Sequence, residues 1–217
     1  MNDVIITQGM VLAGFDHLEY DKRLILLTVD LGRITVFARG VRRQNSRFVG
    51  MTDPFSYGEF SLFAGKSAYN LSGVEISNYF HDIRLDMDRM CYASYFADLA
   101  GYTVKENMEG REILLLLYRS LQALETDSID NELIRAVYEL RIVKENGVYP
   151  GAPKRSVSAG AVSAMEHIEK SEIKELYSFK VSETVRNELI SVADEYRQRY
   201  IGGSFKSLDV LKEIKTG

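Results

Sequence analysis

The chain has 217 residues, of which 46% are hydrophobic and 27% are charged, and its formal net charge is -4. This balance excludes a disordered chain, and the acidic total argues against a generic nucleic-acid binder, which is usually basic. The single cysteine, Cys91, excludes an intramolecular disulfide and a multi-cysteine metal site. The sequence shows no secretory leader and no apolar run of about 18 residues, so we expect a cytoplasmic protein that does not enter a membrane.

The first 80 residues carry the pattern of β-strands. Short runs rich in β-branched and aromatic residues alternate with turn-forming residues; these runs cover residues 5–12, 23–29, 33–41, 55–63 and 68–76. Two of the connections, 30–32 and 64–67, are short enough for hairpins. Residues 42–54 form one longer connection with room for about one helical turn. Five short strands with one long connection predict a small barrel of the OB type rather than a sandwich.

After about residue 82 the hydrophobic repeat changes to the helical period of about 3.6 residues. Apolar residues then fall on single helical faces in segments near residues 92–102, 114–124, 133–138, 158–169 and 181–200. The sequence therefore predicts a multi-domain α+β protein. We expect an N-terminal five-stranded OB-type barrel in residues 1–80 and an all-α helical domain in residues 81–217.

The residues that commonly build a catalytic centre are scattered. His17, His81 and His167 have no neighbours at the spacing of metal ligands. The chain contains no glycine-rich phosphate loop, no nucleophile elbow and no paired histidine and cysteine. We therefore predict no catalytic residues, no metal site and no cofactor.

Positive charge is concentrated in the segment ARGVRRQNSRFVG, residues 38–50. No acidic residue lies between Asp30 and Asp53, whereas five arginines do: Arg33, Arg39, Arg42, Arg43 and Arg47. Such a run creates a local positive field whatever the net charge of the rest of the molecule. The alternative is a basic, solvated loop that binds nothing.

Strand alternation in residues 33–41 divides this region between two faces. Ile34, Val36 and Ala38 point one way and suit the barrel interior, so Arg33, Phe37 and Arg39 point outward. OB barrels bind single strands by stacking bases on aromatic side chains in a basic groove, and arginine grips phosphates with a planar, permanently charged fork. The alternative is that Phe37 packs under the helical domain. We predict sequence-independent DNA binding at Arg33, Phe37, Arg39, Arg42, Arg43, Arg47 and Lys66.

Several stretches resemble one bacterial family, the recombination mediator RecO. The likeness includes Gly9-Met-Val-Leu, the run LLT before a glycine turn and, most distinctively, ARGVRRQNSR at residues 38–47. Near the C-terminus, FKVSE at 179–183 and FKSLDVL at 205–211 also resemble the family, so the likeness extends over nearly the whole chain.

This resemblance implies the same barrel-plus-helices fold. It implies binding of single- and double-stranded DNA, annealing of complementary strands, and cooperation with RecR to load RecA onto DNA covered by single-stranded-DNA-binding protein, whose C-terminal tail the helical domain would capture. It implies a nucleoid-associated location. The DNA-contacting positions of the family map onto Arg39, Arg42, Arg43 and Arg47, whereas Arg33, Phe37 and Lys66 rest on strand geometry alone.

The chain departs from the family in one respect. Many members carry two CxxC pairs in the helical domain after a segment like NGVYP, but residues 151–165 here contain no cysteine, so we expect no zinc finger. Two other functions remain open from the residues: an adaptor whose barrel binds acidic peptides, with DNA binding incidental, and a nuclease or other DNA enzyme.

Overall fold

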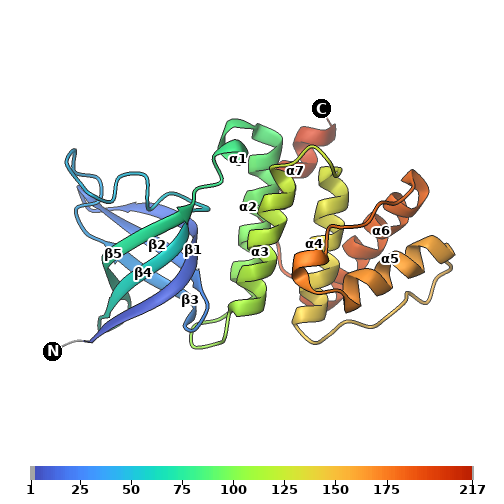
Figure 1. The fold of residues 1–217 in the computed structure, drawn as a ribbon, viewed down its shortest axis with the longest axis horizontal. Coiled ribbons are helices and arrows are strands. Elements are labelled where there is room, and N and C mark those ends of the chain that lie inside the picture. The colour runs from blue at the N-terminus through green and yellow to red at the C-terminus, as the bar shows by residue number, and fades with distance from the viewer. Residues whose placement is uncertain (1–2, 217) are drawn as a thin grey trace. The chain divides into compact units, whose positions relative to one another are not determined.

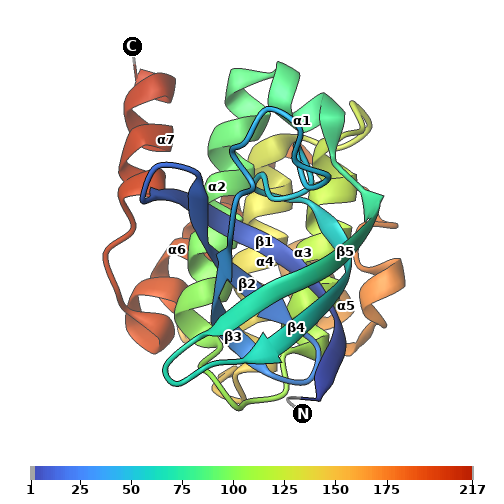
Figure 2. The ribbon, with the colours of Figure 1, turned by 90° about the vertical axis from the view of Figure 1, so that its left-hand side faces the viewer.

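The computed structural model describes residues 3–216 and begins with a small β-barrel (Figure 1). Its strands are β1 (Val4–His17), β2 (Asp21–Thr28), β3 (Gly32–Ala38), β4 (Tyr57–Ala64) and β5 (Tyr69–Asn78). They close in the order β1-β2-β3-β5-β4, antiparallel except for the parallel pair β3–β5. Figure 2 looks onto this barrel, with β4 and β5 crossing in front of β1 and β2. The five-stranded OB-type barrel and both hairpins predicted from the sequence are confirmed.

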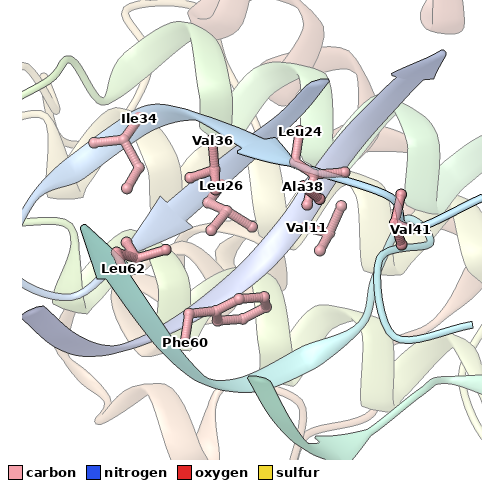
Figure 3. Close-up of a cluster of buried hydrophobic side chains, with 9 residues drawn as sticks. All are labelled: Val11, Leu24, Leu26, Ile34, Val36, Ala38, Val41, Phe60 and Leu62. Carbon is pink, nitrogen blue, oxygen red and sulfur yellow. The ribbon is translucent and has the colours of Figure 1, made fainter. Parts of the chain in front are cut away.

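Alternate residues of the strands point into the barrel interior and fill it. In β3, Ile34, Val36 and Ala38 are buried while Arg33 is exposed and Phe37 is half-buried, as the alternation predicts. Figure 3 shows the apolar cluster that these three residues share with β1, β2, β4 and the connection after β3: Val11, Leu24, Leu26, Val41, Phe60 and Leu62. Because the interior uses this face of β3, the alternate face is directed outward.

The long connection between β3 and β4, residues 39–56, closes one end of the barrel. Successive turns, rather than the expected helical turn, form its first half: the amide of Arg43 donates to the carbonyl of Gly40, and that of Ser46 to the carbonyl of Arg43. Left-handed glycines at Gly40 (φ 64°) and Gly50 (φ 76°) interrupt a continuous helix. Val41 is buried in the barrel core, so the connection is packed onto the barrel.

Helices follow the barrel. They are α1 (His81–Leu85), α2 (Met87–Thr103), α3 (Arg111–Leu124), α4 (Asn131–Glu145), α5 (Ala159–Lys170), the short 3₁₀ helix η1 (Ile173–Glu175), α6 (Glu183–Tyr196), the π-helical turn η2 (Arg197–Ile201) and α7 (Lys206–Thr216). The side chains of Asp130, Ser158 and Ser182 accept the first free amides of α4, α5 and α6, which explains where these helices begin. None of the helices in residues 3–216 is long and apolar enough to cross a membrane.

The chain divides into two compact units, and their boundary is not a single point in the sequence. One unit holds the barrel, residues up to 81, together with residues 100–114; the other holds 82–99 and the chain from 115 onward. The connection between α2 and α3 belongs to the barrel unit because the amides of Asn107 and Gly110 donate to the carbonyls of Leu31 and Val29 at 2.9 Å. The sequence did not indicate this grouping. The assignment of separate functions to residues 1–80 and 81–217 remains a prediction.

The helical unit is built around α4, whose residues from Leu133 to Val143 are all buried. Part of this core is charged: the Arg135 guanidinium lies 3.1 Å from the Glu139 carboxylate, which also accepts a 2.6 Å hydrogen bond from the Tyr95 hydroxyl. Burial raises the pKa of Glu139 and outweighs the opposing effect of Arg135.

Candidate nucleic-acid interface

A row of side chains crosses the outer face of the barrel. Phe15 of β1 pairs with Arg23 of β2, Arg23 with Phe37 of β3, and Phe37 with Asn70 of β5. Directly paired residues on neighbouring strands share one face of the sheet, so an arginine lies between two phenylalanines. Phe15 is 47% exposed, Arg23 is exposed and Phe37 is half-buried. The surface therefore offers aromatic faces next to a positive charge.

Local contacts hold this row in place. The Arg23 guanidinium lies 5.0 Å from the centre of the Phe15 ring, a cation–π arrangement that orients both groups. On the other side, the His17 and Phe37 rings lie 4.9 Å apart. Sequence reasoning missed Phe15 because it ended the first strand at residue 12, and without Phe15 it had no reason to assign Arg23, the first residue of the predicted strand 23–29, to this surface. The hairpin register that pairs them is the signal that could have found them.

The basic connection is anchored at its start by the hairpin between β1 and β2. The Gly40 amide donates to the Asp21 carboxylate at 2.7 Å, and the Arg42 amide donates to the Tyr20 carbonyl at 2.9 Å. The Arg42 side chain lies 3.1 Å from the Asp16 carboxylate and donates to the Glu19 carbonyl at 3.3 Å. Arg42 is therefore partly neutralised and helps to fix the path of the connection.

The other arginines of the connection lie against rings or are open. The Arg43 guanidinium lies 5.4 Å from the centre of the Tyr20 ring. Arg47 lies 4.7 Å from the Phe48 ring and donates to the Ser72 carbonyl of β5 at 2.7 Å, which ties the connection across the barrel end. Arg39 is exposed and forms no ion pair with any residue between 3 and 216. Aromatic and backbone contacts leave the charge of Arg43 and Arg47 unneutralised.

The structure brings most of the predicted set together but separates two members. Arg33 pairs with Leu27 at the start of β3, six residues before Arg39 and thus on the order of 20 Å away along the strand. Its side chain lies beside Gly101: a Cβ added to Gly101 would lie 3.6 Å from the Arg33 Cδ. Lys66 is exposed on the turn between β4 and β5. Phe37, Arg39, Arg42, Arg43 and Arg47 share one end of the barrel, which Phe15 and Arg23 extend.

Within the described residues, no group of three or more histidine, cysteine, aspartate or glutamate side chains is placed to hold a metal ion. Cys91 lies in the helical unit, partly buried, and burial raises the pKa of its thiol, which keeps it in the unreactive protonated form.

These features define a class: an α+β protein in which an OB-type barrel with an aromatic and cationic outer surface precedes a bundle of helices. Residues 1–80 match the family model described as recombination protein O N terminal, and residues 84–154 match that of recombination protein O C terminal. The two models together cover more than half of the chain. The chain belongs to the RecO family.

Curated relatives agree with this assignment, two of them over nearly their whole length. The chain is 28% identical over 244 residues to the DNA repair protein RecO of Acetivibrio thermocellus, with 96% of each chain covered. It is 25% identical to the protein of the same name from Clostridium novyi, with 96% of this chain and 94% of the relative covered. Identity to the Alkaliphilus metalliredigens protein of that name is 32% over 161 residues, which cover 74% of this chain and 65% of the relative.

Proposed function

We propose that the chain is a non-enzymatic DNA repair and recombination mediator that binds single- and double-stranded DNA and anneals complementary strands. The observation that carries this proposal is the barrel surface, where Phe15, Arg23 and Phe37 lie beside the anchored basic connection. Membership of the RecO family, whose curated relatives are named DNA repair proteins, supports the repair role.

The physical basis is charge neutralisation combined with stacking. Arginines that contact phosphates release condensed counterions and lower the repulsion between two strands brought together for pairing. Exposed rings provide stacking partners for unpaired bases whatever their sequence. Arg39, Arg43 and Arg47 are the cations of the connection that have no carboxylate partner among the described residues, so they carry the phosphate contacts in this proposal.

The proposal extends to protein partners: RecR, RecA through RecR, and the C-terminal tail of single-stranded-DNA-binding protein, in the cytoplasm and associated with the nucleoid. Residues 1–80 carry eight basic and eight acidic side chains, so the whole net charge of -4 belongs to the helical part, which is poorly suited to a long phosphate backbone.

Two cavities of about 450 and 440 Å³ flank the segment 179–182 and combine Phe179 and Val181 with Lys180. The 450 Å³ cavity also contains Asp130 and Glu183, which balance Lys180 and Arg186. The lining of the 440 Å³ cavity has Lys180 and no carboxylate. Apolar groups beside a cation suit a peptide that ends in a carboxylate, so we assign the tail to the 440 Å³ cavity.

Removing the two most open arginines tests the DNA surface. The variant Arg39→Ala plus Arg43→Ala should weaken binding of a single-stranded oligonucleotide. The slope of log affinity against log salt should become shallower by about 0.7 for each lost phosphate contact. The measurement is a salt titration of fluorescence anisotropy with the full chain. Far-UV circular dichroism checks that the variant keeps its fold.

A matched control removes two exposed lysines from the helical unit, Lys170→Ala plus Lys174→Ala, and changes the net charge equally. If both variants lose the same affinity and slope, the effect comes from net charge and the barrel assignment fails. If bare oligonucleotides do not bind at moderate salt without a protein partner, the chain is an adaptor instead. Cleavage of labelled DNA with turnover in Mg²⁺ or Mn²⁺ would overturn the non-enzymatic assignment.

A further inference from the structure

The helical unit contains a small cavity of about 220 Å³, formed by the connection between α4 and α5 and by the end of α6 with the turn η2. Its lining combines cations, tyrosines and proline: Pro153, Lys154, Arg155, Tyr196, Arg199 and Tyr200. The one acidic residue in the lining is Glu195, so the cavity carries a surplus of two positive charges. The surplus is notable because it occurs in the acidic part of the chain.

The π-helical turn η2 directs these side chains into the cavity. Its first residue, Arg197, is buried and lies 3.7 Å from the Glu139 carboxylate of α4. The amide of Gly202 closes the wide turn on the Arg197 carbonyl at 2.9 Å. With Arg197 held in the interior, the same turn presents Arg199 and Tyr200 to the cavity. Single π-helical turns are frequent at functional sites.

The opposite wall is fixed by hydrogen bonding and packing. The Tyr196 hydroxyl donates to the Gly151 carbonyl at 2.8 Å and joins the connection to α6. The Tyr149 and Tyr196 rings pack edge to face, with centres 6.0 Å apart. Arg155 is held by Ser191 at 2.9 Å and by Glu195 at 3.4 Å. The cavity therefore keeps its shape without a ligand.

Two cations in the cavity remain available. Lys154 is exposed and forms no ion pair with any described residue. Arg199 is exposed and lies 5.6 Å from the centre of the Tyr200 ring, which is only half-buried. Tyr200 in turn stands perpendicular to Tyr196, with ring centres 5.6 Å apart. An aromatic ring in one cavity with two unneutralised cations has the composition of a nucleotide site.

We propose that this cavity binds one nucleotide of a single DNA strand, with the base on the Tyr200 ring and the phosphate on Arg199 and Lys154. The volume lies below the range of about 300–1,000 Å³ that is usual for pockets that enclose drug-sized ligands, which suits one planar base with its phosphate at the rim. The site is distinct from the barrel surface and shares with the proposed function only the assumption that DNA is the partner.

Photo-cross-linking locates the bound strand. An oligo(dT) that carries 5-iodouracil is cross-linked to the full chain, and the modified peptides are identified by mass spectrometry. We expect a cross-link at Tyr200 that persists in the variant Arg39→Ala plus Arg43→Ala. It should disappear in Lys154→Ala plus Arg199→Ala. If no cross-link reaches residues 196–200 in the unaltered chain, the proposal is wrong.

Affinity measurements provide the second arm. Lys154→Ala plus Arg199→Ala should make the salt slope for single-stranded DNA shallower by about 1.4, the value for two phosphate contacts; the control Lys170→Ala plus Lys174→Ala should not. Tyr200→Phe should keep the affinity, whereas Tyr200→Leu should reduce it several-fold. Circular dichroism confirms that each variant is folded.

The outcomes separate this proposal from the barrel assignment. If only the barrel variant changes DNA binding, the cavity is not a DNA site; if only the cavity variant does, the barrel assignment fails and the cavity stands. A third arm titrates deoxythymidine monophosphate alone. The mononucleotide could suppress the cross-link at Tyr200 while Lys154→Ala plus Arg199→Ala leaves the affinity and salt slope for the oligonucleotide unchanged. In that case the cavity binds a free nucleotide, and the proposal for a DNA strand is overturned.

Discussion

Gly32 joins the barrel strands to the connection between α2 and α3. It has a left-handed backbone conformation (φ 69°), and a Cβ at this position would overlap the Lys105 carbonyl oxygen and lie 2.8 Å from that of Met108. Only a residue without a side chain allows the β2–β3 turn and residues 105–108 to approach so closely. This glycine therefore has two roles: it allows the β2–β3 turn to form, and it allows residues 105–108 to pack against that turn.

Gly32→Ala should lower the free energy of unfolding by more than about 2 kcal/mol, because it adds backbone strain of about 1–3 kcal/mol and a clash with fixed backbone. Gly50→Ala is the matched control, since Gly50 is also left-handed (φ 76°) but a Cβ there would meet nothing within 4 Å. It should cost only the left-handed strain of about 1–2 kcal/mol. Urea unfolding of both variants gives the comparison, and equal losses would mean that the close approach contributes nothing.

At the scale of the element, the connection of residues 39–56 owes its path to acidic groups on the neighbouring hairpin. Asp21 accepts the Gly40 amide and Asp16 pairs with the Arg42 side chain. The arginines of ARGVRRQNSR are therefore not equivalent. Arg42 holds the connection against the hairpin, whereas Arg39 has no acidic partner among residues 3–216.

Arg42→Ala should reduce DNA affinity and flatten the salt slope less than Arg43→Ala does, because Arg42 is already paired and has fewer counterions to release. Its effect on stability should stay below about 1 kcal/mol, as both partners are largely solvated. Asp16→Asn should raise the affinity for DNA by freeing Arg42. Salt titrations of the three single variants check these expectations. A slope that falls more for Arg42→Ala than for Arg43→Ala would contradict the division of roles.

Local patterns allowed the elements to be predicted, whereas relations between elements could not be read from the sequence. Alternation places Phe37 and Arg39 outside the barrel because consecutive strand residues face opposite ways. The pairing of Phe15 with Arg23 depends on hairpin register. The packing of residues 100–114 against the barrel depends on the backbone hydrogen bond from Gly110 to Val29. Neither feature produces a periodic pattern in the sequence. The cavity beside Tyr200 could not be predicted because an apolar stripe through Val185, Leu189 and Tyr196 indicates an ordinary α-helix, and the π-helical turn interrupts it at Arg197.

At the scale of the whole molecule, charge is distributed unevenly between surface and interior. Arg135, Glu139 and Arg197 are buried together in the helical unit, with Asp194 2.8 Å from Arg135 and the Tyr95 hydroxyl on Glu139. Removing one member of such a group leaves the others without compensation. The buried charges therefore make the stability of the helical unit depend on pH.

Burial raises the pKa of Glu139 above its usual value of 4.5. Between the pKa of the unfolded chain and that of the folded one, the folded carboxyl keeps its proton while the unfolded one has lost it. The contribution of Glu139 to the free energy of unfolding therefore falls as pH rises through this window. The difference in stability between the unaltered chain and Glu139→Gln should decrease with rising pH above 4.5, by up to about 1.4 kcal/mol for each pH unit that the window spans. Urea unfolding followed by circular dichroism at several pH values measures it.

The control for this experiment is Glu166→Gln, which removes an exposed carboxylate that pairs with Lys170 on α5. Its difference from the unaltered chain should stay nearly flat over the same pH range. A Glu139→Gln difference that increases with pH would show that Arg135 and Tyr95 overcome the cost of burial.

The parallel seam between β3 and β5 registers only two residue pairs, Val36 with Tyr69 and Phe37 with Asn70. The hairpins on either side, β2–β3 and β4–β5, join strands that are adjacent in the sequence. The β3–β5 pairing instead requires residues 39–56 to be placed across the barrel end. Pairings between residues so far apart in the sequence form slowly. The Arg47 bond to Ser72 of β5 forms with that step. A partly synthesised or partly folded chain therefore carries the arginines of the connection without the assembled barrel surface. The proposed DNA-binding surface is complete only when the barrel closes.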